Sequence, residues 1–226
     1  MSHDLISRKD YTRAEHLSDV AVHLVALAAA IVAVPVLITM AALRVGDVSA
    51  VVAVAVYGTT MLAMIACSAL YNGFPRVRFA GLFRRLDHAA IYFKIAGTYT
   101  PFTLLTGQGA WLLTGLWGAA LAGSWLRVFG AARWKWIAFA LYLVMGWAGV
   151  LLGWPMFAAL SAPVIALMLA GGVLYTVGTV FLLWERLPFH NTIWHGFVMA
   201  ATGLFFAAVA LQVADSAAIA ATAPAP

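Results

Sequence analysis

Two apolar runs meet in residues 67–102, CSALYNGFPRVRFAGLFRRLDHAAIYFKIAGTYTPF, through a short basic turn. Five polar residues of this stretch lie at the ends of the runs or inside the second one: Ser68, Asn72, Asp87, His88 and Lys94. Charged side chains within an apolar helix are costly in lipid unless they face the interior of a bundle. The stretch therefore predicts a membrane fold and indicates where its polar site lies.

The composition of the 226-residue chain is that of a membrane protein. Hydrophobic residues make up 65% and charged residues 9%, against roughly 45–50% and about 25% in soluble domains. A soluble domain of this size cannot bury so much apolar surface. The net charge of +5 does not indicate nucleic-acid binding, because the basic residues lie in short links between apolar runs. We expect membrane lipids as partners and no nucleic acid.

A membrane helix needs about 20 apolar residues, and by this measure the chain contains seven predicted spans. They cover residues 20–43, 48–72, 87–106, 110–128, 134–152, 157–183 and 190–213. The first run is longer than the core of a cleaved signal peptide, so we expect it to stay in the membrane. The sequence thus predicts an all-α, seven-helix transmembrane bundle at 20–213. A cytosolic amino-terminal segment (1–19) precedes it, and a flexible tail (214–226) follows it.

The distribution of Lys and Arg predicts the orientation of the bundle. Arg44 alone falls in an outside link and Lys94 falls within a span. With the amino terminus in the cytosol, the other eleven of the thirteen basic residues lie inside: Arg8, Lys9, Arg13, Arg76, Arg78, Arg84, Arg85, Arg127, Arg133, Lys135 and Arg186. We therefore expect a cytosolic amino terminus and a carboxyl terminus on the outside.

Four predicted helices place polar side chains in one layer at their cytosolic ends. In three of these helices the spacing is i, i+4, which puts the side chains on one helix face. The residues are Glu15, Asp19 and His23 on the first helix, Ser68 and Asn72 on the second, Asp87 and His88 on the third, and Asn191 and His195 on the seventh. Each one taken alone has a structural interpretation, such as a helix-end charge or a bond to its own backbone. Their convergence predicts a functional polar pocket.

Lys94 is expected deeper in the bundle than this layer. It follows Asp87 by seven residues on the same helix face, which is about 10 Å further in at 1.5 Å per residue. A lysine within a span costs about 2.5–3.5 kcal/mol and usually faces the bundle interior with a partner. The expected partners are Asp19 and His23 or backbone carbonyls near Pro101; the alternative is an extended side chain that reaches the cytosolic interface.

The segments SALYN, LDHAAIYFKIAGTYTPF and NTIWHGFV, at residues 68–72, 86–102 and 191–198, resemble the bacterial hemolysin III family. That family is the prokaryotic branch of the progestin and adipoQ receptor family, and its relatives are regarded as related to alkaline ceramidases. The resemblance covers nearly the whole chain. It implies a multi-pass protein of the bacterial inner membrane, with seven helices and a cytosolic amino terminus.

The resemblance also implies a zinc site. The adiponectin receptors bind zinc through three histidines, of which one follows a serine by four residues on helix two and two form an HxxxH pair on helix seven. A serine and an aspartate lie near the metal. By position, the serine matches Ser68, the aspartate matches Asp87, and the last ligand matches His195.

This sequence departs from the zinc pattern at two of the three ligand positions, which are Asn72 and Asn191. Zinc prefers imidazole, thiolate or carboxylate ligands, and an amide is a weak substitute. His23 or His88 could replace the missing histidines, with Asp87 as a carboxylate ligand. Whether the chain is an enzyme therefore depends on whether zinc binds.

A proton or ion pathway, suggested by Lys94 within a span, is disfavoured because few polar residues continue to the outer side beyond Thr98, Thr100 and Thr103. Three other functions are weighed from the sequence. The first is a role in membrane lipid homeostasis or sensing, with Asn72, Asn191, His195 and Asp87 as a hydrogen-bonded polar cluster. The second is a zinc-dependent, ceramidase-like hydrolase of lipid amides, in which Asp87 acts as a base and Ser68 binds the oxyanion. The third, a cytolysin, is disfavoured because seven apolar spans cannot leave a membrane as a soluble toxin.

Overall fold

The computed structural model describes residues 11–74, 78–130 and 132–222. These residues form helices and no strand, so the predicted all-α class is confirmed for them. In chain order the helices are α1 (Arg13–Arg44), α2 (Val48–Gly73), α3 (Ala80–Thr106), α4 (Ala110–Phe129), the 3-10 helix η1 (Ala132–Trp134), α5 (Lys135–Leu152), α6 (Trp154–Ala158), α7 (Ala162–Leu183) and α8 (His190–Thr222). Arg8, Lys9 and Arg76, which entered the orientation argument, lie outside the described residues.

The helix ends follow from local chemistry. A capping box starts α1, since the Thr12 hydroxyl accepts from the Glu15 backbone and the Glu15 carboxylate accepts from the Thr12 backbone. Asp47 caps α2 through the backbone of Ala50. After α3 the chain turns at Gly107, whose φ of 68° favours glycine. The first helix thus begins at Arg13, several residues before the predicted membrane span.

Two predicted boundaries differ from the structure near the carboxyl terminus. The span predicted at 157–183 is interrupted, because α6 ends at Ala158 and α7 begins at Ala162 with a proline in its first turn. The last helix continues to Thr222, so most of the segment expected as a tail is helical. Asp215 accepts a hydrogen bond from Ser161 at 2.7 Å, which ties this extension to the start of α7.

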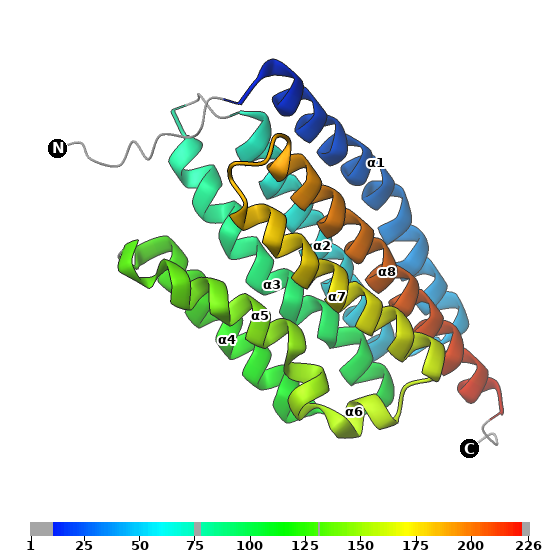
Figure 1. The fold of residues 1–226 in the computed structure, drawn as a ribbon. Helices are drawn as coiled ribbons and strands as arrows, with labels where there is room; N and C mark the ends of the chain where they lie inside the picture. Colours follow the sequence, from blue (N-terminus) through cyan, green and yellow to red (C-terminus); the bar gives the residue numbers. More distant parts are fainter. Residues whose placement is uncertain (1–10, 75–77, 131, 223–226) are drawn as a thin grey trace.

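The long helices run side by side in one bundle, as Figure 1 shows. The first helix packs between α2 and α8, and α8 also packs along α7. The third helix is central, because it contacts α2, α4, α5 and α8. Contact between α5 and α7 is slight. The first helix begins at one end of the bundle and the last helix ends at the other.

Glycines allow the central helices to approach closely. A Cβ atom at Gly58 would collide with Val34 of α1, and one at Gly97 would collide with the Thr60 side chain of α2. A Cβ at Gly123 of α4 would lie 2.6 Å from the Tyr92 ring. Small residues at helix contacts are typical of membrane bundles, where close packing replaces the hydrophobic driving force.

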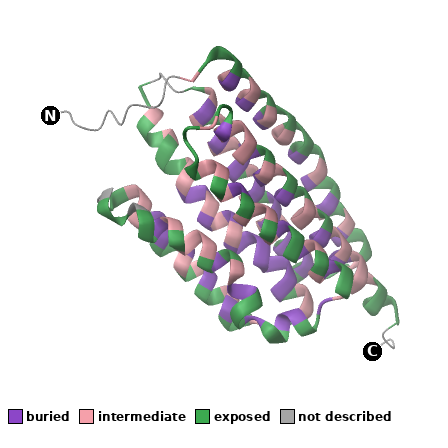
Figure 2. Ribbon diagram, viewed as in Figure 1, coloured by how far each residue is buried: buried purple, intermediate pink, exposed green. Residues whose placement is uncertain are grey.

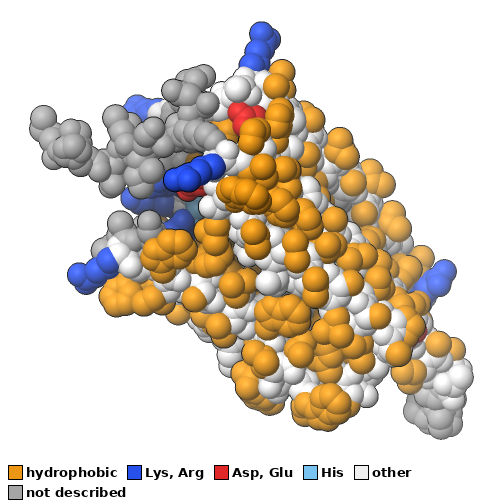
Figure 3. All heavy atoms as spheres, viewed as in Figure 1, with side chains coloured by type: hydrophobic (Ala, Val, Ile, Leu, Met, Phe, Trp, Pro, Cys, Tyr) orange, Lys and Arg blue, Asp and Glu red, His pale blue; other side chains and the backbone are white. Residues whose placement is uncertain are grey.

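Apolar side chains cover the outside of the bundle as well as its core. Leu43 is 81% exposed and Trp154 is 76% exposed. Hydrophobic side chains extend along the face drawn in Figure 3, with Lys and Arg near its ends, and exposed residues recur along each helix in Figure 2. A surface of this kind fits lipid as the solvent.

Five of the described helices are long and apolar enough to cross a membrane: α1, α2, α4, α7 and α8. Residues Trp136–Leu152 of α5 form a shorter apolar helix. The third helix falls outside this set, and it carries charged residues that include Asp87 and Lys94. The multi-pass membrane class is therefore supported, whereas the count of seven spans and the orientation stay predictions.

Candidate functional site

The carboxylate of Asp19 lies at the centre of a buried polar cluster between α1, α2 and α8. Its Oδ1 atom is 2.6 Å from Nδ1 of His195, and both side chains are 7% exposed. Its Oδ2 atom accepts a hydrogen bond from the Asn191 amide at 3.2 Å. Because Asn191 and His195 lie one turn apart on α8, both reach the same carboxylate.

His23, one turn further along α1, links the backbone of Asp19 to α2. Its Nδ1 atom donates to the carbonyl oxygen of Asp19 at 2.8 Å, because a carbonyl can only accept. In the neutral ring Nε2 then carries a lone pair, and it accepts from the Ser68 hydroxyl at 3.0 Å. The rings of His23 and His195 meet edge to face, with centroids 4.4 Å apart. Three helices are thereby joined through buried polar atoms.

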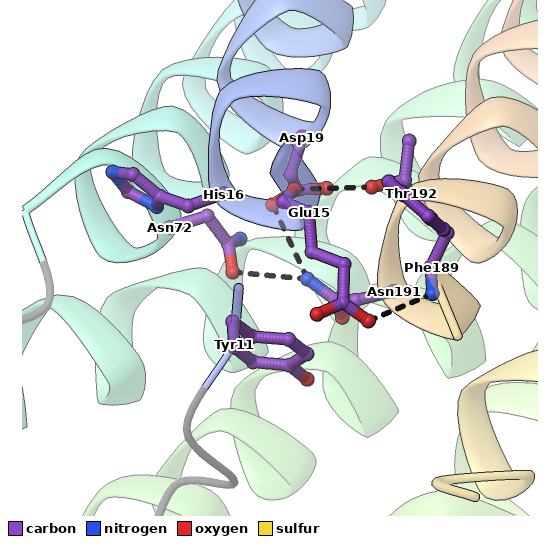
Figure 4. Close-up of a pocket in the computed structure, with 8 residues that line it drawn as sticks. All are labelled: Tyr11, Glu15, His16, Asp19, Asn72, Phe189, Asn191 and Thr192. Carbon is purple, nitrogen blue, oxygen red and sulfur yellow. Dashed lines mark hydrogen bonds between the residues drawn. The ribbon is translucent and has the colours of Figure 1, made fainter. Parts of the chain in front are cut away.

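The two amide side chains complete the network. The Asn191 amide donates to Oδ1 of Asn72 at 3.3 Å as well as to Asp19, as Figure 4 shows. Asn72 in turn donates to the backbone oxygen of Ser68 at 3.0 Å and to its hydroxyl at 3.3 Å. A continuous chain of hydrogen bonds therefore runs from α2 through α8 to α1.

The third helix contributes one of its two predicted residues to this cluster. The Asp87 carboxylate interacts with the Ser68 side chain and lies close enough to His195 and Asp19 for electrostatic interaction. His88 lies elsewhere: its Nδ1 atom contacts the backbone oxygen of Arg84. Successive residues are about 100° apart on an α-helix. Asp87 and His88 therefore point in different directions, and the structure does not bring His88 into the cluster.

At the end of the bundle where α1 starts, the cluster borders a small pocket that the start of α1 and the turn before α8 close. Glu15 accepts from the backbone N–H of Phe189 at 2.9 Å and from the Thr12 hydroxyl at 2.9 Å. Phe189 has a φ of 58°, a left-handed conformation that is unusual for a bulky residue. The pocket is lined by Tyr11, Glu15, His16, Asp19, Asn72, Phe189, Asn191 and Thr192 (Figure 4).

Lys94 is buried apart from this cluster, at 3% exposure. Its ammonium donates to the Thr98 hydroxyl at 2.7 Å and lies 4.7 Å from the centre of the Tyr57 ring. No salt bridge to Lys94 occurs among the described residues. Lys94 thus faces the bundle interior as expected, and Thr98 takes the place of Asp19 or His23 as its partner.

A group of residues suited to holding a metal ion lies within the cluster. Asp19, His23 and His195 each offer one ligand atom, and these atoms all lie within 4.8 Å of one another. All three residues are buried. The sequence had suggested His23 as a replacement ligand, but it had not suggested Asp19. The i, i+4 spacing of Asp19 and His23 was the available signal, because such a pair can bind one ion from one helix face.

Comparison with known proteins identifies the family of the chain. A family model described as "Haemolysin-III related" matches residues 11–206. The chain belongs to the hemolysin III family. "Hemolysin-3" of Bacillus cereus is 39% identical over 193 residues, which are 83% of this chain and 88% of the relative. "Hemolysin-3 homolog" of Bacillus subtilis (strain 168) is 35% identical over 199 residues, which are 87% of this chain and 93% of the relative.

The matched region of this hemolysin III chain contains the whole polar cluster, from Glu15 to His195. Two arrangements of metal ligands can be compared within it. Asn72, Asn191 and His195 would offer one imidazole and two neutral amides, which form a weak set for a transition metal. Asp19, His23 and His195 offer two imidazoles and a carboxylate, a set that such metals favour. The residues present therefore fit a metal ion, but not at the two asparagines.

Proposed function

We propose that this hemolysin III protein acts in membrane lipid homeostasis as a zinc-dependent hydrolase of lipid amides. One observation carries the proposal: a group able to bind a metal lies beside the Ser68 hydroxyl and the Asp87 carboxylate. A nucleophile activator, a hydrogen-bond donor and a carboxylate are the groups that amide hydrolysis requires. The apolar outer surface favours a substrate that reaches the site from lipid.

In this proposal the metal ion, Ser68 and Asp87 each have a separate role in hydrolysis. A zinc ion held by Asp19, His23 and His195 would lower the pKa of water to about 7 and so supply a nucleophile at neutral pH. Hydrolysis forms a C–O bond between water and the carbonyl carbon and then breaks the C–N bond, so that the products are a carboxylic acid and an amine. Ser68 is placed to donate a hydrogen bond to the carbonyl oxygen as negative charge develops. Asp87 is placed to receive a proton from water and deliver it to the amine.

The test of this proposal is hydrolysis by the purified full chain. The protein, in detergent micelles with zinc, would be incubated with ceramide-type lipid amides that carry a labelled acyl chain. We expect release of labelled fatty acid, measured by mass spectrometry. Loss of one oxyanion donor in Ser68→Ala should lower the rate about 10²-fold. His88→Gln is the matched control and should retain the rate, because His88 lies outside the cluster.

Two results would contradict the hydrolase. One is a zinc-loaded, folded protein that releases no fatty acid from any lipid amide tested. The other is hydrolysis that survives Ser68→Ala and Asp87→Asn unchanged, because the activity would then come from another site or from a contaminant.

A second candidate function is metal-free sensing of a lipid head group or a proton. It is favoured by the unbroken chain of hydrogen bonds through Asn72, Asn191, Asp19 and His195. A charged head group or an added proton in the pocket would rearrange these bonds and change the packing of α1 against α8. This candidate predicts that purified protein contains no metal and that its unfolding temperature responds to lipids with charged head groups.

The name of the relatives suggests cell lysis, and we do not extend it to this chain. A lytic toxin must travel through water before it inserts, whereas this chain carries several long apolar helices that need lipid continuously.

We further infer that the bundle crosses the bacterial inner membrane seven times with its amino terminus in the cytosol. The opposite ends at which α1 starts and α8 stops support an odd number of crossings, and the excess of Lys and Arg supports the orientation. A reporter protein fused after Pro226 tests both. Activity of the reporter on the outer side is expected, and activity in the cytosol would overturn the topology.

A further inference from the structure

We propose that Asp19, His23 and His195 are the metal ligands of this chain, and that Asn72 and Asn191 are their supports rather than lost ligands. The inference rests on the proposed function, because it assigns the donors of the same site. It changes how the two asparagines are interpreted. Their hydrogen bonds hold the carboxylate ligand in place. The two asparagines are therefore not the remains of a zinc site that has lost two of its ligands.

The three donors already converge on one position. Two come from successive turns of α1 and one comes from α8, and their ligand atoms lie within 4.8 Å of one another. Ligand atoms around a tetrahedral zinc ion are about 3.3 Å apart, given metal–nitrogen distances of about 2.0 Å. Side-chain rotations that move the ligand atoms by less than about 2 Å therefore suffice to bring all three within bonding distance of one ion. No helix has to move.

The hydrogen bonds of His23 prepare its ring for a metal. The backbone oxygen of Asp19 fixes the proton on Nδ1, which leaves the lone pair of Nε2 facing the cluster and Ser68. Metal-bound histidines commonly donate their second N–H to a backbone carbonyl or a carboxylate, which fixes the tautomer and raises ligand basicity. His23 has this arrangement.

The asparagines support the carboxylate oxygen of Asp19 that would not bind the metal ion. Asn191 donates to Oδ2, so that Oδ1 remains directed at His195. Asn72 accepts from Asn191 and so fixes the orientation of its amide. An amide can donate two hydrogen bonds, whereas a histidine ring used as a ligand has one N–H for support. Position 191 therefore suits the second coordination shell of a carboxylate ligand.

Three protein donors leave a fourth position open, as in catalytic metal sites. Ser68 is next to the three donors, because its hydroxyl contacts Nε2 of His23. Asp87 interacts with Ser68 and with the His195 side of the cluster. The assignment therefore keeps both residues in the roles that the proposed hydrolysis needs.

The test uses cobalt(II) as a spectroscopic substitute for zinc. The full chain in detergent micelles is stripped with a chelator and titrated with cobalt(II), and visible absorption and bound metal per chain are measured. We expect one ion per chain, with the intense visible bands of four-coordinate cobalt. Asp19→Asn, His23→Gln and His195→Gln should each weaken binding at least 100-fold. His88→Gln should bind like the unmodified chain.

Substitution of Asn191 distinguishes a residue that supports a ligand from a residue that is itself a ligand. Asn191→Ala should weaken cobalt binding about 10–100-fold, as expected for a residue that supports a ligand, and it should leave the four-coordinate spectrum intact. If Asn191 were itself a ligand, its removal would change the spectrum. Unfolding temperatures measured without metal show whether each variant is folded; a variant that is unfolded is replaced by Asp19→Glu or His23→Asn in the same assay.

The possible outcomes separate this inference from the proposed function. Binding that requires the three residues, without hydrolysis, upholds the ligand assignment and overturns the hydrolase. Metal-dependent hydrolysis that persists in Asp19→Asn and His23→Gln overturns the ligand assignment and upholds the hydrolase. A stripped and titrated protein that binds no metal overturns both.

Discussion

The bundle buries two sets of ionisable side chains in different ways. In the Asp19 cluster each charged or polar group faces a complementary one, so that carboxylate, imidazole and amide satisfy one another. Lys94 has one hydroxyl and two aromatic rings around its ammonium. The difference teaches that burial alone does not make a group structurally essential. A paired group is costly to remove because its partners remain, whereas an isolated cation leaves little unsatisfied behind.

The largest effect is expected for Asp19→Ala. The change leaves the side chains of His195 and Asn191 buried without their acceptor, and each buried group that loses its partner costs about 1–3 kcal/mol of unfolding free energy. Thermal and denaturant unfolding in micelles would measure it. Asp47→Ala is the control, because Asp47 caps the start of α2 and its loss should cost about 1 kcal/mol. Equal effects of the two variants would refute the idea of a mutually paired cluster.

A smaller loss is expected for Glu15→Ala, which opens the pocket between the start of α1 and the turn before α8. The change removes the acceptor of the Phe189 backbone N–H and should lower stability by about 1–3 kcal/mol. The exchange rate of the Phe189 amide hydrogen should increase more than the exchange rates of amides in α1 and α2. Glu15→Gln keeps one acceptor oxygen and should show a smaller change; an unchanged exchange rate in Glu15→Ala would show that the turn is held by other contacts.

Two tyrosines, Tyr57 and Tyr175, allow a matched pair of variants. The Tyr175 hydroxyl is 2.7 Å from the Thr202 hydroxyl, so Tyr175→Phe should cost about 1 kcal/mol. The buried Tyr57 hydroxyl has no hydrogen-bond partner among the described residues, so Tyr57→Phe should leave stability unchanged or raise it. A loss in Tyr57→Phe equal to that in Tyr175→Phe would reveal a partner for Tyr57.

The smallest effect is expected for Lys94→Met. The methionine side chain fills a similar volume without the buried charge, and no carboxylate is left unpaired among the described residues. Unfolding free energy should change by under about 1 kcal/mol or increase. A loss of several kcal/mol would instead show that Lys94 has a strong ionic partner, and the contrast with the Asp19 cluster would fail.

The sequence predicted the helical class and the layer in which polar groups gather, because both follow from the spacing of apolar and polar residues along single helices. The i, i+4 stripe of Asp19 and His23 and the pair Asn191 and His195 each lie on one face whatever the neighbouring helices do. The partners of these groups could not be read in the same way. Which helix faces Asp19 depends on how α1 and α8 are rotated and aligned, and packing along their whole lengths sets both.

His88 and Lys94 illustrate the same limit. The sequence placed His88 in the pocket with its neighbour Asp87, although a turn of 100° between them separates their directions. It also offered Asp19 and His23, or backbone carbonyls near Pro101, as partners of Lys94, whereas the structure gives Lys94 the hydroxyl of Thr98. Composition and periodicity by themselves determined an all-helical membrane protein with a polar layer. Tertiary structure alone decided that Asp19, His23 and His195 meet, because contacts between distant segments depend on helix packing rather than on spacing within one helix.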